Sequence, residues 1–342
     1  MTAMRAARLH APRVVRVDEV PRPVPQPGEV LVRIDHVGVC GSDVHLYQGH
    51  RSAPYPIIMG HEGLGRIEAV GVGVGAERVN QRVVVEPNVA CGVCAWCRRG
   101  RGAICPNKRS LGVNVPGAFA EYVALPATHA WAVPDALSWQ DAVLIEPLAV
   151  AVHAVAVSGL IPGDAALVLG CGTIGLVLTR LLATMRIGVY AIDLDERRVD
   201  AARRAGAHEA AVMPRETAAA LAQQVYADAA WLVIFECYGT ASGAAWCLEA
   251  VPRGGTVVLL GLATEPVSLQ PLRVVREGIV ITGSIIYDHP DDFRRAIALV
   301  RGGLRVGDLV ESEFPMDAVE AALRAAGGAL AGKAVVRVAA LR

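Results

Sequence analysis

The sequence predicts two domains, a β-rich domain followed by a doubly wound α/β domain with a parallel sheet. Three observations lead to this prediction. The chain has 342 residues, which is long for a single core. Short β-rich runs broken by Pro and Gly fill the stretch from about Val14 to Val85, whereas strands alternate with helices after Pro134. Hydrophobic residues make up 53% of the chain, enough to fill both cores.

The expected strands of the first domain are the runs VVRVDEV, EVLVRIDHV, GRIEAVG and RVVVEP. Proline and glycine separate them, most densely in PRPVPQPG at residues 21–28. The composition then changes, and residues 138–158 are typical of a helix. Ser138 is placed to cap the N-terminus of this helix and Gly159 to end it.

In the second domain, AALVLG, VYAID, WLVIFECYG, TVVLLGLA and IVITGSII are the expected strands. Helices are expected through LVLTRLLATM and RRVDAARRAGA between the first of them. The last segment has a helix-helix-strand order and is expected to return to the first domain. We therefore predict a first domain over 1–145 with a lobe at 86–110, a doubly wound domain over 146–287, and a C-terminal return over 288–342.

The bulk composition excludes several classes of partner. Lys+Arg and Asp+Glu are both 33, so the chain has no basic surplus with which to bind nucleic acid. The N-terminus has no apolar signal-peptide core, and no apolar run is long enough to need a bilayer. We expect a cytoplasmic protein whose eight cysteines are metal ligands or free thiols rather than disulfides.

The spacing C-x2-C-x2-C-x7-C allows four thiolates to surround one Zn²⁺ and predicts a zinc lobe at Cys91, Cys94, Cys97 and Cys105. A zinc ribbon that contacts nucleic acid is the alternative, since Arg98, Arg99, Arg101, Lys108 and Arg109 lie nearby. Zn²⁺ with four thiolates is net negative, which gives these cations a local reason to be there. The other three cysteines, Cys171, Cys237 and Cys247, lack metal spacing and are expected in the core.

A second candidate metal set lies upstream, at Cys40, His61 and Glu62. A thiolate, an imidazole and a carboxylate form the mixed set that a catalytic zinc takes while keeping one position open. Taken singly, a cysteine such as Cys40 is usually a small core residue, and a histidine such as His61 is more often only hydrogen-bonded. Asp43 is expected to hold its loop through backbone hydrogen bonds.

The stretch VLGCGTIG predicts a dinucleotide loop between a buried strand and a helix. Gly170, Gly172 and Gly175 allow the tight turn, the approach of the backbone to a pyrophosphate and close packing, and Thr173 and Ile174 open the helix. Similar loops occur in S-adenosylmethionine-dependent methyltransferases and in flavoproteins, so the motif alone leaves these open.

The residue that selects the cofactor is expected at the end of the next strand. Asp193, eighteen residues after Gly175, can accept hydrogen bonds from the ribose hydroxyls and would repel the extra phosphate of NADP. NAD is therefore expected, with NADP less favoured. Arg198 either stacks on the adenine or is a solvated helix residue.

These motifs together resemble the zinc-containing medium-chain alcohol dehydrogenases. GHEGLGRIEAVGVGV at residues 60–74 is similar to the family's G-H-E-x2-G-x5-G-x2-V signature, and CGSDVH, the four-cysteine lobe, Glu146-Pro147-Leu148-Ala149 and the glycine loop follow in the family's order. The resemblance covers essentially the whole chain and is strongest to the sorbitol and threonine dehydrogenase branch. It implies a two-domain medium-chain dehydrogenase, with a GroES-like catalytic domain and a Rossmann domain.

The resemblance also implies residue roles. Cys40 and His61 would bind a catalytic zinc, with Glu62 and Glu146 as carboxylate members of which one is direct; which one stays open. The four-cysteine lobe would hold a second, structural zinc. Ser42 and His45 would carry the proton away from the substrate hydroxyl. Gly261 and Leu262 would shape the nicotinamide site through backbone contacts, and the segment Ser284 to Tyr287 would line it.

The substrate is less well specified. Sorbitol dehydrogenases tend to carry an aromatic residue and an arginine where this chain has Leu46 and Ile286, which puts sorbitol itself in doubt. A secondary alcohol such as a diol, a polyol or a sugar derivative is expected, with Tyr47, Tyr55 and Tyr287 as candidate pocket residues and threonine as an alternative. A non-catalytic dinucleotide sensor of the same fold is a further alternative. By analogy the chain is expected to form a homodimer or homotetramer.

Overall fold

The computed structural model describes residues 2–213, 218–227 and 232–338, and the chain divides into two compact units. Unit 1 comprises residues 1–146 and 305–342, and unit 2 comprises residues 147–304. The expected C-terminal return began at 288, but residues 288–304 belong to unit 2. They contain α9 (Asp291–Arg301), whose Asp292 carboxylate is hydrogen-bonded to Nδ1 of His153 at 2.7 Å and whose Phe293 packs on Tyr287.

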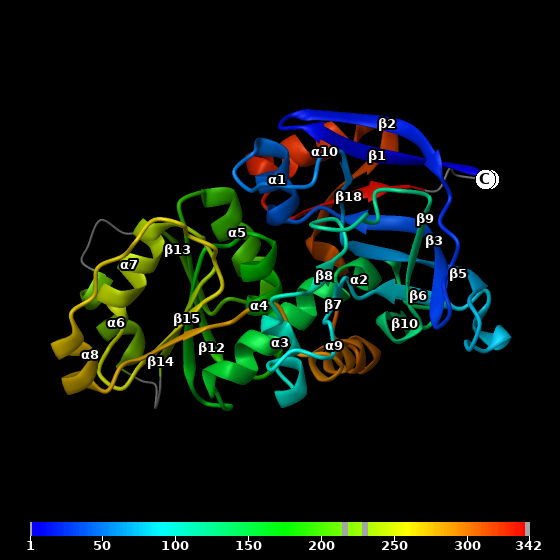
Figure 1. The fold of residues 1–342 in the computed structure, drawn as a ribbon. Helices are drawn as coiled ribbons and strands as arrows, with labels where there is room; N and C mark the ends of the chain where they lie inside the picture. The colour runs from blue at the N-terminus through cyan, green and yellow to red at the C-terminus, as the bar shows by residue number, and fades with distance from the viewer. Residues whose placement is uncertain (1, 214–217, 228–231, 339–342) are drawn as a thin grey trace. The chain divides into compact units, whose positions relative to one another are not determined.

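Unit 1 is β-rich, as predicted (Figure 1). Its largest sheet has seven strands in the order β10-β6-β5-β3-β18-β17, with β9 also paired to β3. A three-stranded sheet has the order β2-β1-β4, and β7 pairs with β8. The strands are β1 (Ala3–Ala11), β2 (Val14–Pro21), β3 (Glu29–Gly38), β4 (Ile57–Ile58), β5 (Glu62–Val70), β6 (Arg82–Val85), β7 (Asn88–Val89), β8 (Arg109–Ser110), β9 (Tyr122–Pro126), β10 (Ala130–Ala132), β17 (Val310–Pro315) and β18 (Lys333–Arg337).

The helices of unit 1 are short. They are α1 (Gly41–Gln48), α2 (Trp139–Val143) and α10 (Val319–Arg324), with the single turns η1 (Ala76–Arg78), η2 (Cys97–Arg99), η3 (Gly102–Ile104), η4 (Ala127–His129), η5 (Gly307–Leu309), η6 (Met316–Ala318) and η7 (Ala325–Ala329). The predicted return of the C-terminus contains β17 before its helix, a strand that the sequence did not suggest. Residues 339–341 of the expected last strand lie outside the described residues.

The helix expected over 138–158 is divided. Ser138 caps α2 by accepting a hydrogen bond from the Asp141 backbone N–H, as predicted, but the helix stops at Leu144. A second helix, α3 (Ile145–Ser158), begins there and ends at Gly159. Pro147 explains the interruption, because proline has no N–H for a helical bond and is tolerated only in a first turn.

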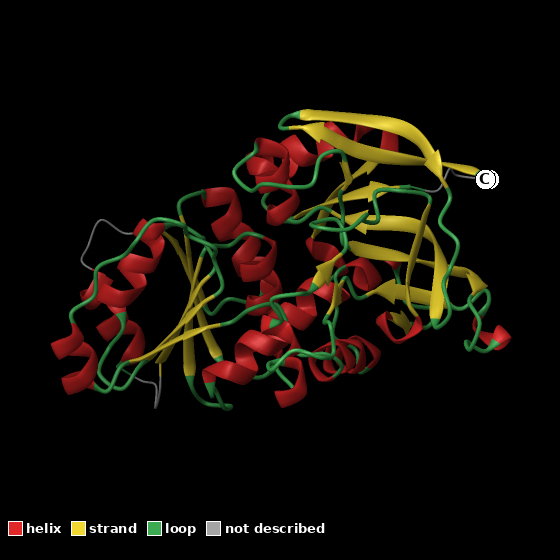
Figure 2. Cartoon of the chain, viewed as in Figure 1, coloured by secondary structure: helices red, strands yellow, loops and turns green. Residues whose placement is uncertain are grey.

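Unit 2 has a six-stranded parallel sheet in the order β13-β12-β11-β14-β15-β16, which confirms the doubly wound prediction. Figures 1 and 2 show helices on both faces of this sheet, with α4 and α5 on one face and α6 and α7 on the other. The strands are β11 (Ala165–Leu169), β12 (Gly188–Asp193), β13 (Glu209–Val212), β14 (Leu232–Glu236), β15 (Thr256–Leu259) and β16 (Val280–Gly283). Besides α9 and most of α3, the helices are α4 (Thr173–Thr184), α5 (Glu196–Ala205), α6 (Ala218–Tyr226), α7 (Ala241–Ala250) and α8 (Pro271–Glu277).

Each unit has its own core. Aliphatic residues from β1, β3, β5, β9 and β18 fill that of unit 1, and β11, β14 and β15 are buried in that of unit 2. Cys171 and Cys247 are fully buried, as expected for core residues. Among the described residues no helix combines the length and the apolar character that crossing a membrane requires.

Candidate functional site: two metal clusters and a dinucleotide loop

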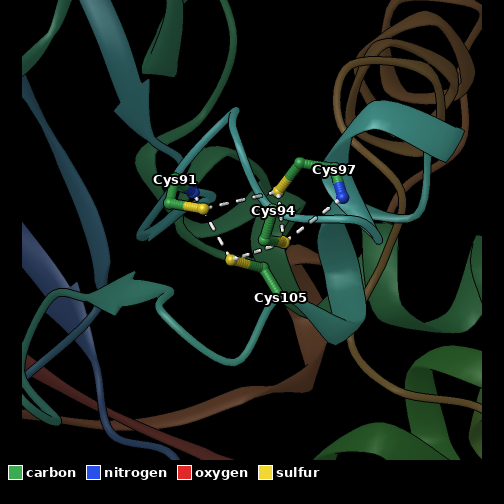
Figure 3. A group of neighbouring side chains, drawn as sticks. All are labelled: Cys91, Cys94, Cys97 and Cys105. Atoms are coloured by element: carbon green, nitrogen blue, oxygen red, sulfur yellow. Dashed lines mark hydrogen bonds between the residues drawn. The ribbon is translucent and has the colours of Figure 1, made fainter.

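The four cysteines of the lobe converge on one point (Figure 3). The Sγ atoms of Cys94 and Cys97 are 3.4 Å apart, and those of Cys91 and Cys97, and of Cys94 and Cys105, are each 3.9 Å apart. A tetrahedron with Zn–S bonds of about 2.3 Å has edges of about 3.8 Å. The lobe thus has the size of a four-thiolate zinc site, and the pairing of β7 with β8 closes its base.

The protonation of these thiols also suits a cation. Backbone N–H groups of Val93 and Cys94 lower the pKa of Cys91 to about 6. Burial, together with the hydrogen bond of the Cys94 thiol, raises the pKa of Cys97 to about 12. Four thiols so close together do not ionise together without a positive charge between them, and Zn²⁺ supplies that charge.

The second cluster brings Cys40, His61 and Glu62 together, with one ligand atom of each within 4.8 Å of the others. Cys40 is the N-cap of α1, and Glu62 is the first residue of β5. The turn before His61 requires glycine, because Gly60 has φ +85° and a Cβ there would lie 2.7 Å from the Phe119 ring.

Asp43 orients this cluster. Its buried carboxylate accepts hydrogen bonds from the backbone N–H of Cys40 at 2.9 Å and of Gly60 at 3.2 Å, in the loop-holding role that was expected. One of its oxygens also lies 3.5 Å from Nδ1 of His61, a contact that the sequence did not suggest. Because Asp43 faces Nδ1, Nε2 is the imidazole nitrogen left for a metal.

The charges around His61 favour its positive form in the absence of a metal. Burial by itself would lower the pKa of His61, but the negative charges of Asp43 and Cys40 raise it well above its usual value. A cation held by the same residues is stabilised by the same charges. The donor set, the burial and the anionic surroundings therefore fit a zinc ion.

Lys333 is a member of this region that sequence reasoning missed. Its Nζ donates to Glu62 Oε1 at 2.7 Å and to the Val39 carbonyl at 3.1 Å, and the residue is 2% exposed. Burial by itself would lower the pKa of Lys333, but the charge of Glu62, with those of Cys40 and Glu146, raises it. The only signal in the sequence is a lysine that opens a strand and is followed by three apolar residues.

The remaining expected catalytic residues lie on two helices. Ser42 Oγ is 3.4 Å from His61 Nε2, and the exposed His45 is one turn further along α1. Glu146 is buried in the first turn of α3. Its carboxylate is not part of the three-residue cluster, although its charge acts on Lys333.

Two of the three candidate pocket tyrosines are buried rather than open to a ligand. Tyr47 is 5% exposed and donates its hydroxyl to Glu320 at 2.8 Å, while Tyr287 is 2% exposed and packs on Phe293. Leu46 is fully buried in the core of unit 1. Tyr55, which is half-buried, is the one of the three tyrosines that keeps a partly open ring.

In unit 2, the three glycines of the loop have the three expected properties. Gly170 has φ +97°, a Cβ at Gly172 would meet no atom within 4 Å, and a Cβ at Gly175 would lie 1.9 Å from the Gly170 carbonyl oxygen. The first allows the turn, the second leaves room for a phosphate, and the third allows the helix to pack on the strand. Thr173 and Ile174 are the first two residues of α4.

Asp193, the last residue of β12, holds this loop through hydrogen bonds to the backbone. Its carboxylate accepts hydrogen bonds from the backbone N–H of Cys171 at 2.7 Å and of Asp195 at 3.0 Å, and it is 2% exposed. Arg198 on α5 has a buried Nε for which the described residues provide no hydrogen-bond partner.

A buried glutamate that the sequence analysis did not single out organises the neighbouring loops. Glu236 ends β14, and its Oε1 accepts from the backbone N–H of Tyr238 and of Gly239. A Cβ at Gly261 would lie 2.3 Å from Glu236 Oε2, so only glycine fits there. Leu262 is 68% exposed, and within the described chain the buried Oγ of Ser284 has no partner, which leaves both available to a ligand.

Comparison with known proteins agrees with these two units. Residues 26–135 match the alcohol dehydrogenase GroES-like domain, and residues 173–302 match the zinc-binding dehydrogenase domain. An L-threonine 3-dehydrogenase of Idiomarina loihiensis is 30% identical over 96% of this chain and 98% of its own length. A sorbitol dehydrogenase of Bacillus subtilis is 32% identical over 94% of each chain.

Solved structures show the same fold. An alcohol dehydrogenase from Escherichia coli CFT073 in complex with NADH has a TM-score of 0.90 at 28% identity, covering 99% of this chain and 100% of its own. A zinc-binding dehydrogenase from Sinorhizobium meliloti bound to NADP has a TM-score of 0.89 at 29% identity with the same coverage. On its fold, its metal clusters and these similarities, the chain belongs to the zinc-containing medium-chain alcohol dehydrogenase family.

Proposed function

We propose that this protein is an NAD-dependent zinc alcohol dehydrogenase that moves hydride between a secondary alcohol and the nicotinamide ring. The observation that carries the proposal is the buried cluster of Cys40, His61 and Glu62, a mixed donor set with one hydroxyl, that of Ser42, beside it. A closed structural site has no need of such a set, whereas a catalytic zinc does.

In this proposal Cys40 and His61 hold the catalytic zinc, with Glu62 and Glu146 as the nearby carboxylates. Zinc in such a site supplies Lewis-acid polarisation of a substrate hydroxyl, which makes that hydroxyl easier to deprotonate. Asp43 fixes the orientation of the His61 ring through its contact with Nδ1. The four-cysteine lobe holds the second zinc of the chain and performs no chemistry.

Ser42 and His45 carry the proton in this proposal. The Ser42 hydroxyl lies against the metal-binding edge of His61. His45 is exposed and on the same helix, so its imidazole can pass a proton to water. In this proposal the Ser42 hydroxyl is the first proton acceptor beside the reacting hydroxyl, and His45 is the group that finally donates the proton to solvent.

NAD is the proposed cofactor because Asp193 ends β12 behind the glycine loop, where its negative charge opposes an additional phosphate. The neighbouring Arg197 is paired with Asp195 at 2.6 Å, so a carboxylate already holds this cation. Gly170, Gly172, Thr173, Ile174 and Gly175 would cradle the pyrophosphate, Arg198 would face the adenine, and Gly261, Leu262 and Ser284 would face the nicotinamide.

A diol, polyol or sugar derivative is the proposed substrate class. Leu46 is buried and Ile286 is aliphatic, so neither provides the polar contacts expected in a sorbitol pocket, and each unmatched buried hydroxyl would cost about 1 to 3 kcal/mol. L-threonine is the second candidate, favoured by the 30% identity to a threonine 3-dehydrogenase over nearly the whole chain.

The test is a substrate screen with NAD and with NADP on polyols, sugar acids, L-threonine, 2,3-butanediol and simple secondary alcohols. We expect turnover with NAD on at least one secondary alcohol, abolished by a chelator, and about two zinc ions per chain. Full activity in the metal-free protein would refute the zinc mechanism, and a preference for NADP would refute the assignment of Asp193.

We also propose that the chain forms a homo-oligomer through β16. This strand lies at the edge of the six-stranded sheet, and Val280 and Ile285 in and after it are 47% and 40% exposed. An apolar edge strand is a template for pairing with a second copy. Light scattering would give the mass of a dimer or tetramer, and a monomer would refute the proposal.

A further inference from the structure

The pairing of three strands places Lys333 beside the candidate zinc ligands. In the large sheet β5 pairs with β3 on one side and β18 pairs with β3 on the other. Glu62 lies opposite Gly38, and Val335 lies opposite Gly38 from the other side. Since side chains alternate between faces, Lys333, two residues before Val335, is on the same face of the sheet as Glu62.

Gly38 allows these two side chains to meet. It is the residue of β3 that lies between Glu62 and β18, and a Cβ there would be 1.9 Å from Glu62 Oε2. No left-handed backbone requires glycine at this position, so the reason for it is the space that the carboxylate fills. The glutamate therefore reaches across the middle strand to the lysine.

Lys333 uses one oxygen of Glu62 and leaves the other. Nζ donates to Oε1 at 2.7 Å, whereas the buried Oε2 has no hydrogen-bond partner among the described residues. The ammonium and the carboxylate are about equally inaccessible, with side chains 2% and 1% exposed. Burying two charged groups costs desolvation free energy. The presence of this buried ion pair beside a metal cluster therefore points to a role in that cluster.

The charges of the cluster show what that role is. Cys40 as thiolate, Glu62 and Glu146, with the buried Asp43 beside His61, would bring four negative charges to one Zn²⁺, leaving the region at a net charge of about −2. The ammonium of Lys333 reduces that excess to about −1. Coulomb interactions among buried groups are weakly screened, so one added charge changes the affinity for both cations and anions.

We propose that Lys333 is a positioning residue that acts as the fixed counter-cation of the catalytic metal site. It leaves Glu62 a single oxygen for the metal, weakens the attraction of the surrounding carboxylates and thiolate for the divalent ion, and keeps the site able to accept an anionic ligand. This inference rests on the proposed zinc function of Cys40 and His61, which it deepens.

The experiment compares Lys333→Arg, Lys333→Gln and Lys333→Met in the full-length zinc protein. Arginine keeps the charge, glutamine keeps an N–H donor without charge, and methionine keeps only the stem. Zinc release to a chromogenic chelator is measured in each, with Cys40→Ser used to identify the phase that comes from the four-cysteine lobe. A cobalt-substituted set reports the coordination of the metal through its visible absorption.

We expect Lys333→Gln and Lys333→Met to release metal from the Cys40 site about tenfold more slowly or slower still, because removing one buried positive charge strengthens the attraction of the remaining anions for the metal ion. We expect both to bind azide at the cobalt site at least about tenfold more weakly, with Lys333→Arg close to the wild type in both measurements. A lysine that only stabilises the fold would lower the melting temperature of the two neutral variants and leave metal release and azide affinity as they are.

The possible outcomes separate this inference from the proposed function. Unchanged or faster release from the neutral variants, in a wild type that binds two zinc ions, would overturn the role of Lys333 alone. A wild type without a Cys40-dependent metal would overturn the proposed function itself. If Lys333→Met does not fold, Lys333→Gln, which keeps an N–H donor on the side chain, decides the outcome.

Discussion

The two metal clusters of unit 1 are built in opposite ways. The four-cysteine lobe takes all its ligands from residues 91–105, and all four are thiols. The cluster at Cys40 combines a helix N-cap, a turn and the start of a strand, and its lysine comes from β18 near the far end of the chain. One cluster depends on local spacing, and the other depends on the register of a sheet.

Because the two clusters are built differently, a defect in one should have different consequences from a defect in the other. The lobe closes on itself through β7 and β8 and stands apart from the large sheet, so a defect there should disturb a local structure. The Cys40 cluster shares its backbone with β3, β5 and β18, so a defect there should act on chemistry while the sheet survives.

The largest effect is expected from Cys40→Ser. Serine is a poor zinc ligand at neutral pH, so the catalytic ion should be lost and the rate with NAD should fall by about 10³-fold or more, within the range that enzymes owe to such groups. Zinc analysis should give one ion per chain and the melting temperature should change little. Retained activity with one zinc ion would show that the lobe, not this cluster, is catalytic.

Cys97→Ser in the lobe should have the reverse pattern. Loss of a thiolate from a structural zinc site removes folding free energy, of which zinc supplies about 10 kcal/mol or more in small zinc domains and less in a larger one. We expect a lower melting temperature and one zinc ion per chain, with kcat per folded molecule within about threefold of the wild type. A large loss of kcat in the folded protein would contradict a purely structural role for the lobe.

Gly38→Ala should give an intermediate effect. The added methyl would occupy the place of Glu62 Oε2, so the carboxylate must move away from Lys333 and from the metal ligands. We expect about 10- to 100-fold weaker zinc binding at the Cys40 site and a loss of about 1 to 3 kcal/mol in unfolding free energy. Both are measured by chelator competition and by denaturant titration.

Gly188→Ala is the matched control for that variant. It also adds a methyl at the terminal residue of a strand, but the nearest atom to its Cβ is 4.0 Å away. Its zinc affinity should equal that of the wild type and its stability should be unchanged or slightly higher. Equal effects of the two substitutions would mean that the space at Gly38 has no special relation to the metal site.

The smallest effect concerns His36, on the strand that leads to Cys40. Burial against Trp139 lowers the pKa of His36 below 6.5, although Glu313 and Asp35 oppose this. The folded state therefore binds fewer protons than the unfolded state, and stability is lost as the pH falls below about 6.5. His36→Gln should reduce the loss in melting temperature between pH 7.5 and 5.5 by a few degrees, and a loss equal to that of the wild type would contradict this.

Much of the fold was predictable because its signals are local. The run VLGCGTIG predicted β11, the turn and the start of α4, since each glycine answers a local steric demand. The strand β17 was missed because VESEFP carries two acidic residues and alternates in burial, which an isolated sequence of six residues signals weakly. The division of the helix at Leu144 was missed because Pro147 is compatible both with a break and with a kink.

The sequence by itself determined the nature of the chemistry. The spacing of four cysteines, the Cys-His-Glu donor set and the glycine loop are properties of residue type and short distance along the chain, and they predicted zinc and a dinucleotide without any knowledge of packing. Tertiary structure alone decided which charges surround the catalytic cluster. Asp43 faces His61 and Lys333 faces Glu62 because strands distant in sequence are adjacent in the sheet, and no periodicity in the chain encodes that adjacency.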